Sequence, residues 1–159
     1  MSLKSLSVGR PAVAAIGLER WHRWAVYGSL AALTASGLIW LLLHHFARLP
    51  GAFVDRPHWL EPWSLKLHGL AAFVSLFFAG SLLNSHMRRA WQLRRNRASG
   101  AWTAAVFLIL TLSAYLLYYG GGESMHSLVS LAHWLVGLAL VPLFVVHIWL
   151  GRSPRNRIV

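Results

Sequence analysis

The sequence contains no cysteine, and only four of its 159 residues are acidic. The absence of cysteine excludes disulfides, thiolate ligands to haem or iron–sulfur clusters, and the covalent attachment of c-type haem. Charged residues make up 12% of the chain, too few to cover the surface of a soluble domain of this length. Hydrophobic residues, in contrast, make up 57%. This composition predicts an integral membrane protein.

The hydrophobic residues gather into four runs, each close to the length of about 20 residues that an α-helix needs to cross a bilayer. These runs are residues 24–43, 65–85, 101–119 and 128–150. Backbone polar groups in lipid must be paired within their own segment, so each run is interpreted as a membrane-spanning helix. With short connections, the prediction is an all-α, up-down four-helix bundle that forms a single domain over residues 1–159.

The net charge of +11 is unevenly distributed along the chain. Lys and Arg concentrate near the N-terminus, in the linker RRAWQLRRNR (88–97) and in the tail GRSPRNR (151–157). With four spans these segments share one side, and the positive-inside rule places that side and both termini in the cytoplasm. Because topology explains the charge, nucleic acid is not expected as a partner. We expect a multi-pass protein of the bacterial cytoplasmic membrane, in contact with lipid.

Nine histidines are many for a chain with so few charged residues. Several lie at span ends or in loops, where water or lipid headgroups can solvate them: His44, His45, His58, His86 and His126. His68, His133 and His147 lie inside apolar runs, where a polar side chain is costly and usually marks a functional site. These three are the strongest candidates for ligands.

His133 and His147 are separated by 14 residues in the run SLAHWLVGLALVPLFVVHIWLGR. In an α-helix this interval corresponds to about 21 Å and brings both side chains within about 40° of one face. A single metal ion cannot bind both. Two stacked haems could each take one of them together with an imidazole from another helix. Hydrogen bonding between helices is the alternative explanation.

The depth of each histidine in the membrane predicts its partner. His68 and His133 both lie toward the outer side and are expected to form one pair. His147 lies toward the cytoplasmic side, where His22 and His86 are the candidate partners. The 18 residues between His68 and His86 correspond to about 27 Å, about 6 Å more than the interval in the last span. His22 is therefore preferred to His86.

The sequence resembles the di-haem cytochrome b subunits of respiratory dehydrogenases: the gamma subunit of formate dehydrogenase N, the cytochrome b of nickel-iron hydrogenases and, more distantly, bacterial cytochrome b561. The resemblance covers residues 18–152 and rests on RWHRWAVYGSLAALTASG, LKLHG and SLAHWLVGLALVPLFVVHIWLG. It implies two b haems, with His68 and His133 as axial ligands of the outer iron and His22 and His147 of the inner iron. It also implies electron transfer between a periplasmic dehydrogenase or cytochrome partner and the quinone pool.

Further roles follow from the resemblance or from charge. A quinone docks near the inner haem in that family, so RNRASG suggests Asn96 and Gly100 as quinone contacts. Arg23, Arg88 and Arg152 are candidates to hold haem propionates, although topology alone explains each of them. The sequence departs from the family by an additional outer pair, His44 and His45. These could replace His68 if the second span lies lower than expected.

Three alternative functions remain open at this stage. One is a stand-alone quinone oxidoreductase of the cytochrome b561 type that takes electrons from a small diffusible donor. Another is a non-haem, histidine-rich transporter of metal ions or protons, which would need acidic residues in its spans, and the four apolar runs contain none. The last is a structural anchor. No catalytic residue is predicted, because the sequence offers none suited to dehydrogenase chemistry.

Overall fold

The computed structural model describes residues 19–51 and 56–152, and these are helical apart from short connections and one isolated antiparallel bridge between Leu49 and Arg56. The helices are α1 (Arg20–Phe46), α2 (Glu61–Leu82), a π-helical turn (Leu83–Met87), α3 (Arg88–Gln92), α4 (Arg97–Tyr119) and α5 (Glu123–Arg152). α2, the π turn and α3 follow one another without a break. The described residues thus contain four helices long and apolar enough to cross a membrane. The predicted all-α, four-helix membrane fold is confirmed.

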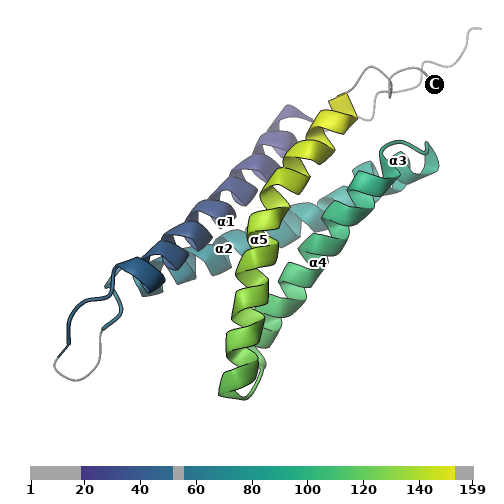
Figure 1. Cartoon of the computed structure of the whole chain (residues 1–159). Coiled ribbons are helices and arrows are strands. Elements are labelled where there is room, and N and C mark those ends of the chain that lie inside the picture. Colours follow the sequence, from purple (N-terminus) through teal and green to yellow (C-terminus); the bar gives the residue numbers. More distant parts are fainter. Residues whose placement is uncertain (1–18, 52–55, 153–159) are drawn as a thin grey trace, which may run out of the picture.

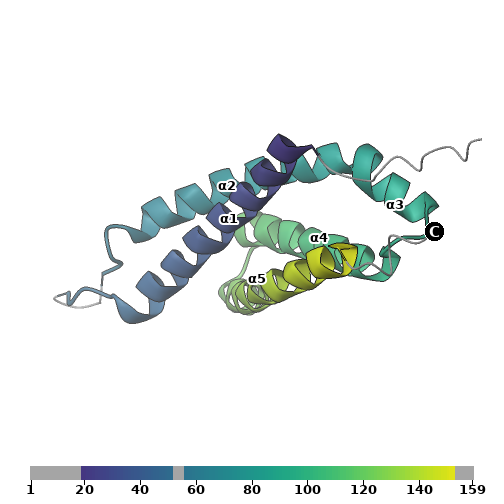
Figure 2. The ribbon, with the colours of Figure 1, turned by 90° about the horizontal axis from the view of Figure 1, so that it is seen from above.

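The four spans form two antiparallel hairpins, α1 with α2 and α4 with α5 (Figure 1). The hairpins lie in two layers that diverge from one another (Figure 2). They meet mainly between α1 and α5, where the rings of Tyr27 and Phe144 pack edge to face with centroids 6.0 Å apart. We call the side of the turn 120–122 the outer side and the side of α3 the inner side. The basic residues Lys4, Arg10, Arg155 and Arg157, used to predict orientation, lie outside the described residues.

The first hairpin is held together through small side chains. Its buried residues include Ser29 and Ser36 on α1, and Ser64, Ala71 and Ser75 on α2. Small residues let two membrane helices approach closely. The hydroxyl of Ser29 donates to the Val26 carbonyl at 3.1 Å and that of Ser36 to the Ala32 carbonyl at 2.7 Å. This close packing places α2 side chains directly against the α1 backbone.

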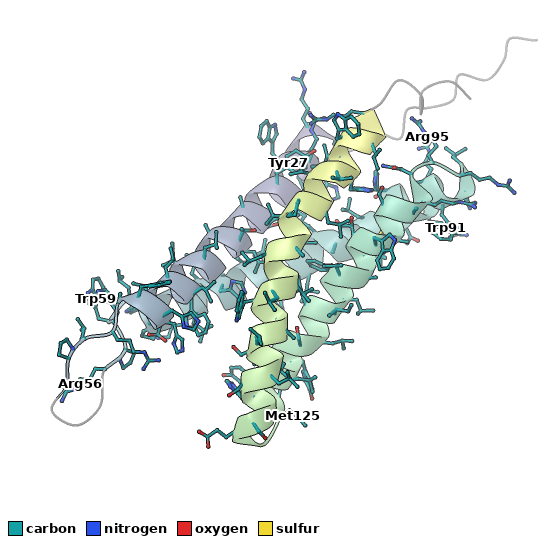
Figure 3. All side chains as sticks on the ribbon, in the orientation of Figure 1. Tyr27, Arg56, Trp59, Trp91, Arg95 and Met125 are labelled. Atoms are coloured by element: carbon teal, nitrogen blue, oxygen red, sulfur yellow. The ribbon has the colours of Figure 1, made fainter. Side chains whose placement is uncertain are left out.

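Large apolar side chains cover the outside of the bundle and project from all four spans (Figure 3). They include Phe73, Phe77, Leu108 and Trp149, all exposed. A soluble monomer rarely exposes so large an apolar surface, whereas a membrane-spanning bundle presents it to lipid. The chain is therefore a multi-pass membrane protein, and the exposed apolar faces of its helices contact lipid.

The second span is not a regular α-helix along its whole length. It runs from Glu61 to Gln92, longer than the predicted 65–85, and the turn Leu83–Met87 is π-helical. A π turn holds more residues than an α turn and occurs often at functional sites. The axial distance between His68 and His86 is therefore shorter than a regular α-helix would give. The spacing argument that favoured His22 over His86 assumed a regular α-helix between His68 and His86, and the π turn departs from that geometry.

The orientation of the bundle in the membrane can be tested by labelling single introduced cysteines, because the chain has no native cysteine that would react. The variants Gln92→Cys and Gly121→Cys place single thiols on the inner and outer sides, respectively. The positive-inside rule predicts that a membrane-impermeant maleimide labels Gly121→Cys in right-side-out vesicles and Gln92→Cys only in inside-out vesicles. Labelling of both thiols from the same side would contradict the four-span fold.

Candidate functional site

Four histidines form two pairs across the space between the hairpins, and each pair takes one imidazole from the second span and one from α5. The ring centroids of His68 and His133 are 6.3 Å apart with an interplanar angle of 77°. Those of His86 and His147 are 6.5 Å apart at 86°. The first pair lies toward the outer side and the second toward the inner side. The structure thus places the two histidines of α5 in separate sites at different depths.

Both histidines of α5 are held by serines of α4. His133 Nδ1 lies 2.7 Å from Ser113 Oγ, and His147 Nδ1 lies 3.0 Å from Ser99 Oγ. Each serine hydroxyl also lies within hydrogen-bond distance of the carbonyl three residues earlier, that of Leu110 at 3.0 Å for Ser113 and that of Asn96 at 3.4 Å for Ser99. A serine that donates to this carbonyl can accept the Nδ1–H of the imidazole. In that tautomer Nε2 of both histidines is a free electron-pair donor.

Sequence reasoning missed Ser99 and Ser113, although a signal was present. The two serines are 14 residues apart, the same interval as His133 and His147. In an antiparallel hairpin, equal intervals on the two helices bring both residue pairs into register. α4 contains no histidine, and its contribution is to orient the histidines of its neighbour.

His68 is oriented by α1. Its Nδ1 lies 3.0 Å from the Leu33 carbonyl oxygen and 3.3 Å from Ser36 Oγ. A carbonyl oxygen can only accept, so Nδ1 carries the proton and Nε2 is again free. Gly37 makes this approach possible, because a Cβ at that position would lie 3.0 Å from Cε1 and 3.1 Å from Nδ1 of His68.

His22 and His86 occupy different environments. His86 lies on the π turn beside His147, and its buried Nδ1 has no hydrogen-bond partner among the described residues. His22 packs against α2, with Nε2 2.8 Å from Ser81 Oγ. That serine donates to the Phe78 carbonyl at 2.7 Å and so accepts the Nε2–H of His22. Because this bond occupies Nε2 of His22, the geometry favours His86 over His22 as the partner of His147.

Asn96 and Gly100 both flank His147. The Asn96 side chain donates from Nδ2 to the His147 carbonyl at 3.1 Å. A Cβ at Gly100 would lie 3.5 Å from Cε1 of His147, an ordinary van der Waals distance. Both residues thus lie next to His147, where the Asn96 amide is bonded to the α5 backbone, and their expected contact with a quinone stays a prediction.

The three candidate arginines all lie at the inner side. Arg23 is in the first turn of α1, Arg88 directly follows the π turn that carries His86, and Arg152 ends α5. Their placement brings guanidinium groups to the same end of the bundle as the inner pair. Membrane topology accounts for this placement equally well.

A separate polar cluster lies at the outer end of the first hairpin. His44 Nδ1 donates to Glu61 Oε1 at 2.6 Å, and the Trp40 ring stacks on His44 with centroids 4.7 Å apart. The ring of His45 contacts that of His44 edge to face. The structure thus places His44 against the first turn of α2, about 10 Å along that helix from His68. The predicted second span began at residue 65, so Glu61 lies in a turn of α2 that precedes the predicted span.

The contrast between Gly37 and Gly100 provides a stability test. Gly37→Ala should force His68 away from α1, and overpacking of this kind costs about 1–3 kcal/mol. Gly100→Ala should be neutral or stabilising, because alanine favours a helix by about 1 kcal/mol and its Cβ fits. Unfolding of the purified protein in detergent, followed by circular dichroism against denaturant, measures both. Equal stability of the two variants would show that His68 does not lie against α1.

Ser113→Ala should leave the Nδ1–H of His133 without an acceptor, at a cost of about 1–3 kcal/mol in unfolding free energy. Thr111→Ala is the matched control, because the Thr111 hydroxyl bonds to the carbonyl of Phe107 in its own helix. The same denaturation measurement compares them. A loss no larger for Ser113→Ala than for Thr111→Ala would argue against the serine anchor.

Comparisons of this chain with protein-family models, with curated proteins and with solved structures found no match. The function therefore has to be argued from the residues themselves. What they provide is two opposed imidazole pairs at different depths of a membrane bundle, and three of these four imidazoles are hydrogen-bonded through Nδ1 within their own hairpin.

Proposed function

We propose that the chain is a di-haem, b-type cytochrome that carries electrons across the membrane between a redox partner on the outer side and the quinone pool. His68 and His133 are the axial ligands of the outer iron. His86 and His147 are those of the inner iron. The proposal rests above all on one observation, the two opposed imidazole pairs contributed by the second and fourth spans.

The spacing of the rings suits a metal ion between them. A metal–imidazole bond is about 2.0 Å long, so two imidazoles on opposite sides of one ion have ring centres about 6 Å apart. The observed 6.3 and 6.5 Å agree with this value. The hydrogen bonds also suit ligation, because Nδ1 of His68, His133 and His147 is bonded within its own hairpin and Nε2 is left to bind the metal.

The donor set favours haem over a metal ion bound by protein alone. In the described part of the chain, no three His, Asp or Glu side chains are grouped so as to hold a metal ion. Two imidazoles per site are sufficient only where the cofactor supplies the remaining ligands, as the porphyrin of a b haem does. The absence of cysteine excludes thiolate ligation.

A b haem supplies one-electron chemistry when bound, the exchange of its iron between the ferrous and ferric states. The chain holds the ligands at two depths, set by the interval of about 21 Å between His133 and His147. α1 and α4 fix the orientation of the imidazoles through hydrogen bonds to Nδ1. The apolar helices around the pairs limit access of water.

The inner side is the proposed place of exchange with quinone. Asn96 and Gly100 border His147 there, and Arg23, Arg88 and Arg152 are proposed partners for haem propionates or quinone oxygens. The positive-inside rule assigns this side to the cytoplasm, in a bacterial inner membrane. An outer redox partner would exchange electrons with the His68–His133 site. A stand-alone oxidoreductase fed by a small diffusible donor is the alternative form of the proposal.

A pyridine haemochrome assay on the purified protein tests the proposal. We expect two b haems per chain, and one after either His133→Ala or His147→Ala. His86→Ala should also leave one, whereas His22→Ala should leave two. His126→Ala, an exposed histidine near the start of α5, is the control and should keep both. Colourless protein from haem-sufficient cells would refute the proposal, and loss through His22 instead of His86 would change the inner pair.

A further inference from the structure

The outer cluster contains a carboxylate that is only half paired. Glu61 is 9% exposed although it lies in the first turn of a membrane span. Its Oε1 accepts a hydrogen bond from His44, but its buried Oε2 has no partner among the described residues. Buried polar atoms are nearly always hydrogen-bonded, and an unpaired one is unfavourable. Oε2 thus offers a buried acceptor for an O–H or N–H group from outside the described chain.

The cluster is connected to both the outer imidazole pair and the aqueous side. Glu61 and His68 are seven residues apart on α2, which is two helical turns and about 10 Å along the same face. His44 bridges Glu61 to the surface, since its side chain is 32% exposed. Glu61 is therefore linked to the aqueous side through its hydrogen bond with His44, and it lies two helical turns from His68.

Few charged groups surround the pair. From the connection after α1, Arg48 places Nη2 of its guanidinium 3.4 Å from Nδ1 and 3.3 Å from Nε2 of His44, and its Nε donates to the His44 carbonyl at 3.1 Å. From α2, Lys66 lies over the Trp63 ring at 4.6 Å. His45 touches only the edge of the His44 ring. Glu61 is the single carboxylate of this cluster in the described residues.

We propose that Glu61 and His44 form a donor site, which binds a molecule with two O–H groups on conjugated carbons and accepts its protons. This inference rests on the proposed function, because the electrons pass to the outer iron. A membrane-borne hydroquinone and a water-soluble ene-diol share the required chemistry. Oxidation of one donor breaks two O–H bonds and forms two C=O bonds. Its two protons leave through Glu61 and His44 to the outer aqueous phase, and its two electrons reduce ferric iron one at a time.

The test compares two reductants on the purified, haem-loaded protein in stopped-flow experiments. Glu61→Gln should slow haem reduction by duroquinol at least about tenfold, since general bases typically contribute 10²–10⁴-fold. Reduction by dithionite, which needs no proton acceptor, should stay within about twofold. Glu123→Gln, an exposed glutamate in the first turn of α5 on the same side, is the matched control. His44→Gln should also slow haem reduction by duroquinol, whereas His45→Gln should leave that rate unchanged.

Binding gives a readout that is independent of electron transfer. With both haems reduced beforehand, duroquinol should quench tryptophan fluorescence, and Glu61→Gln should raise its Kd at least about tenfold, because a hydrogen bond to a charged group is lost. Repeating both measurements with ascorbate distinguishes a membrane-borne donor from a water-soluble one. The donor to which Glu61→Gln is sensitive identifies the source.

The outcomes separate the two proposals. Suppose that the protein contains two haems, but that wild type and Glu61→Gln show the same rates of haem reduction by duroquinol and ascorbate and the same Kd values for both donors. This result would overturn the donor site alone. If Glu61→Gln slowed haem reduction by dithionite as much as haem reduction by duroquinol, or if this variant lost haem, Glu61 would have a purely structural role in the hairpin. A protein without haem would overturn the proposed function itself.

Discussion

An imidazole inside a membrane needs an acceptor for its N–H, and this requirement organises the structure. His68 donates from Nδ1 to the backbone of α1, and Nδ1 of His133 and of His147 is hydrogen-bonded to a serine of α4. For these three histidines Nδ1 is bonded within the hairpin, so Nε2 is the nitrogen left for the space between the hairpins, whereas Nδ1 of His86 has no partner among the described residues. The packing is accordingly close within each hairpin and sparse between them. In the proposed function, each haem would be held between the two hairpins by one imidazole from each of them.

Hydropathy and charge were sufficient to predict the four spans and their up-down order, because lipid allows few other backbone arrangements. Helix periodicity was sufficient to place His133 and His147 on one face at different depths. It could not show that His86 lies beside His147, since the π turn Leu83–Met87 changes the spacing locally and leaves no mark in the hydrophobic pattern. The start of α2 was predicted four residues too late for a similar reason. The charge of Glu61 is typical of a loop residue, but in the structure Glu61 contacts His44 and is the first residue of the helix.

The preference for His22 over His86 shows why spacing alone could not settle the inner pair. Both histidines lie at the inner end of the first hairpin, and depth cannot distinguish them. The distinction depends on hydrogen bonds to individual nitrogens, because Ser81 occupies Nε2 of His22 while the ring of His86 faces His147. Such contacts depend on side-chain rotamers, which sequence patterns do not encode. The serines of α4 are an exception, since their 14-residue interval repeats that of the histidines they hold.

The two ends of the bundle differ in ways that suit different steps of an electron path. Both imidazoles of the outer pair are fixed through Nδ1, and a buried carboxylate with a histidine route to water lies two turns away. The inner pair has one imidazole bonded to Ser99 and one on a π turn whose Nδ1 is unpaired in the described structure, and Arg23, Arg88 and Arg152 lie at the same end of the bundle. In the proposed function, protons would leave at the outer end, where an acceptor is present. The arginines at the inner end would attract the negative charge of a quinone as it is reduced. Under that proposal, the residues that differ between the two ends would give the electron path a direction.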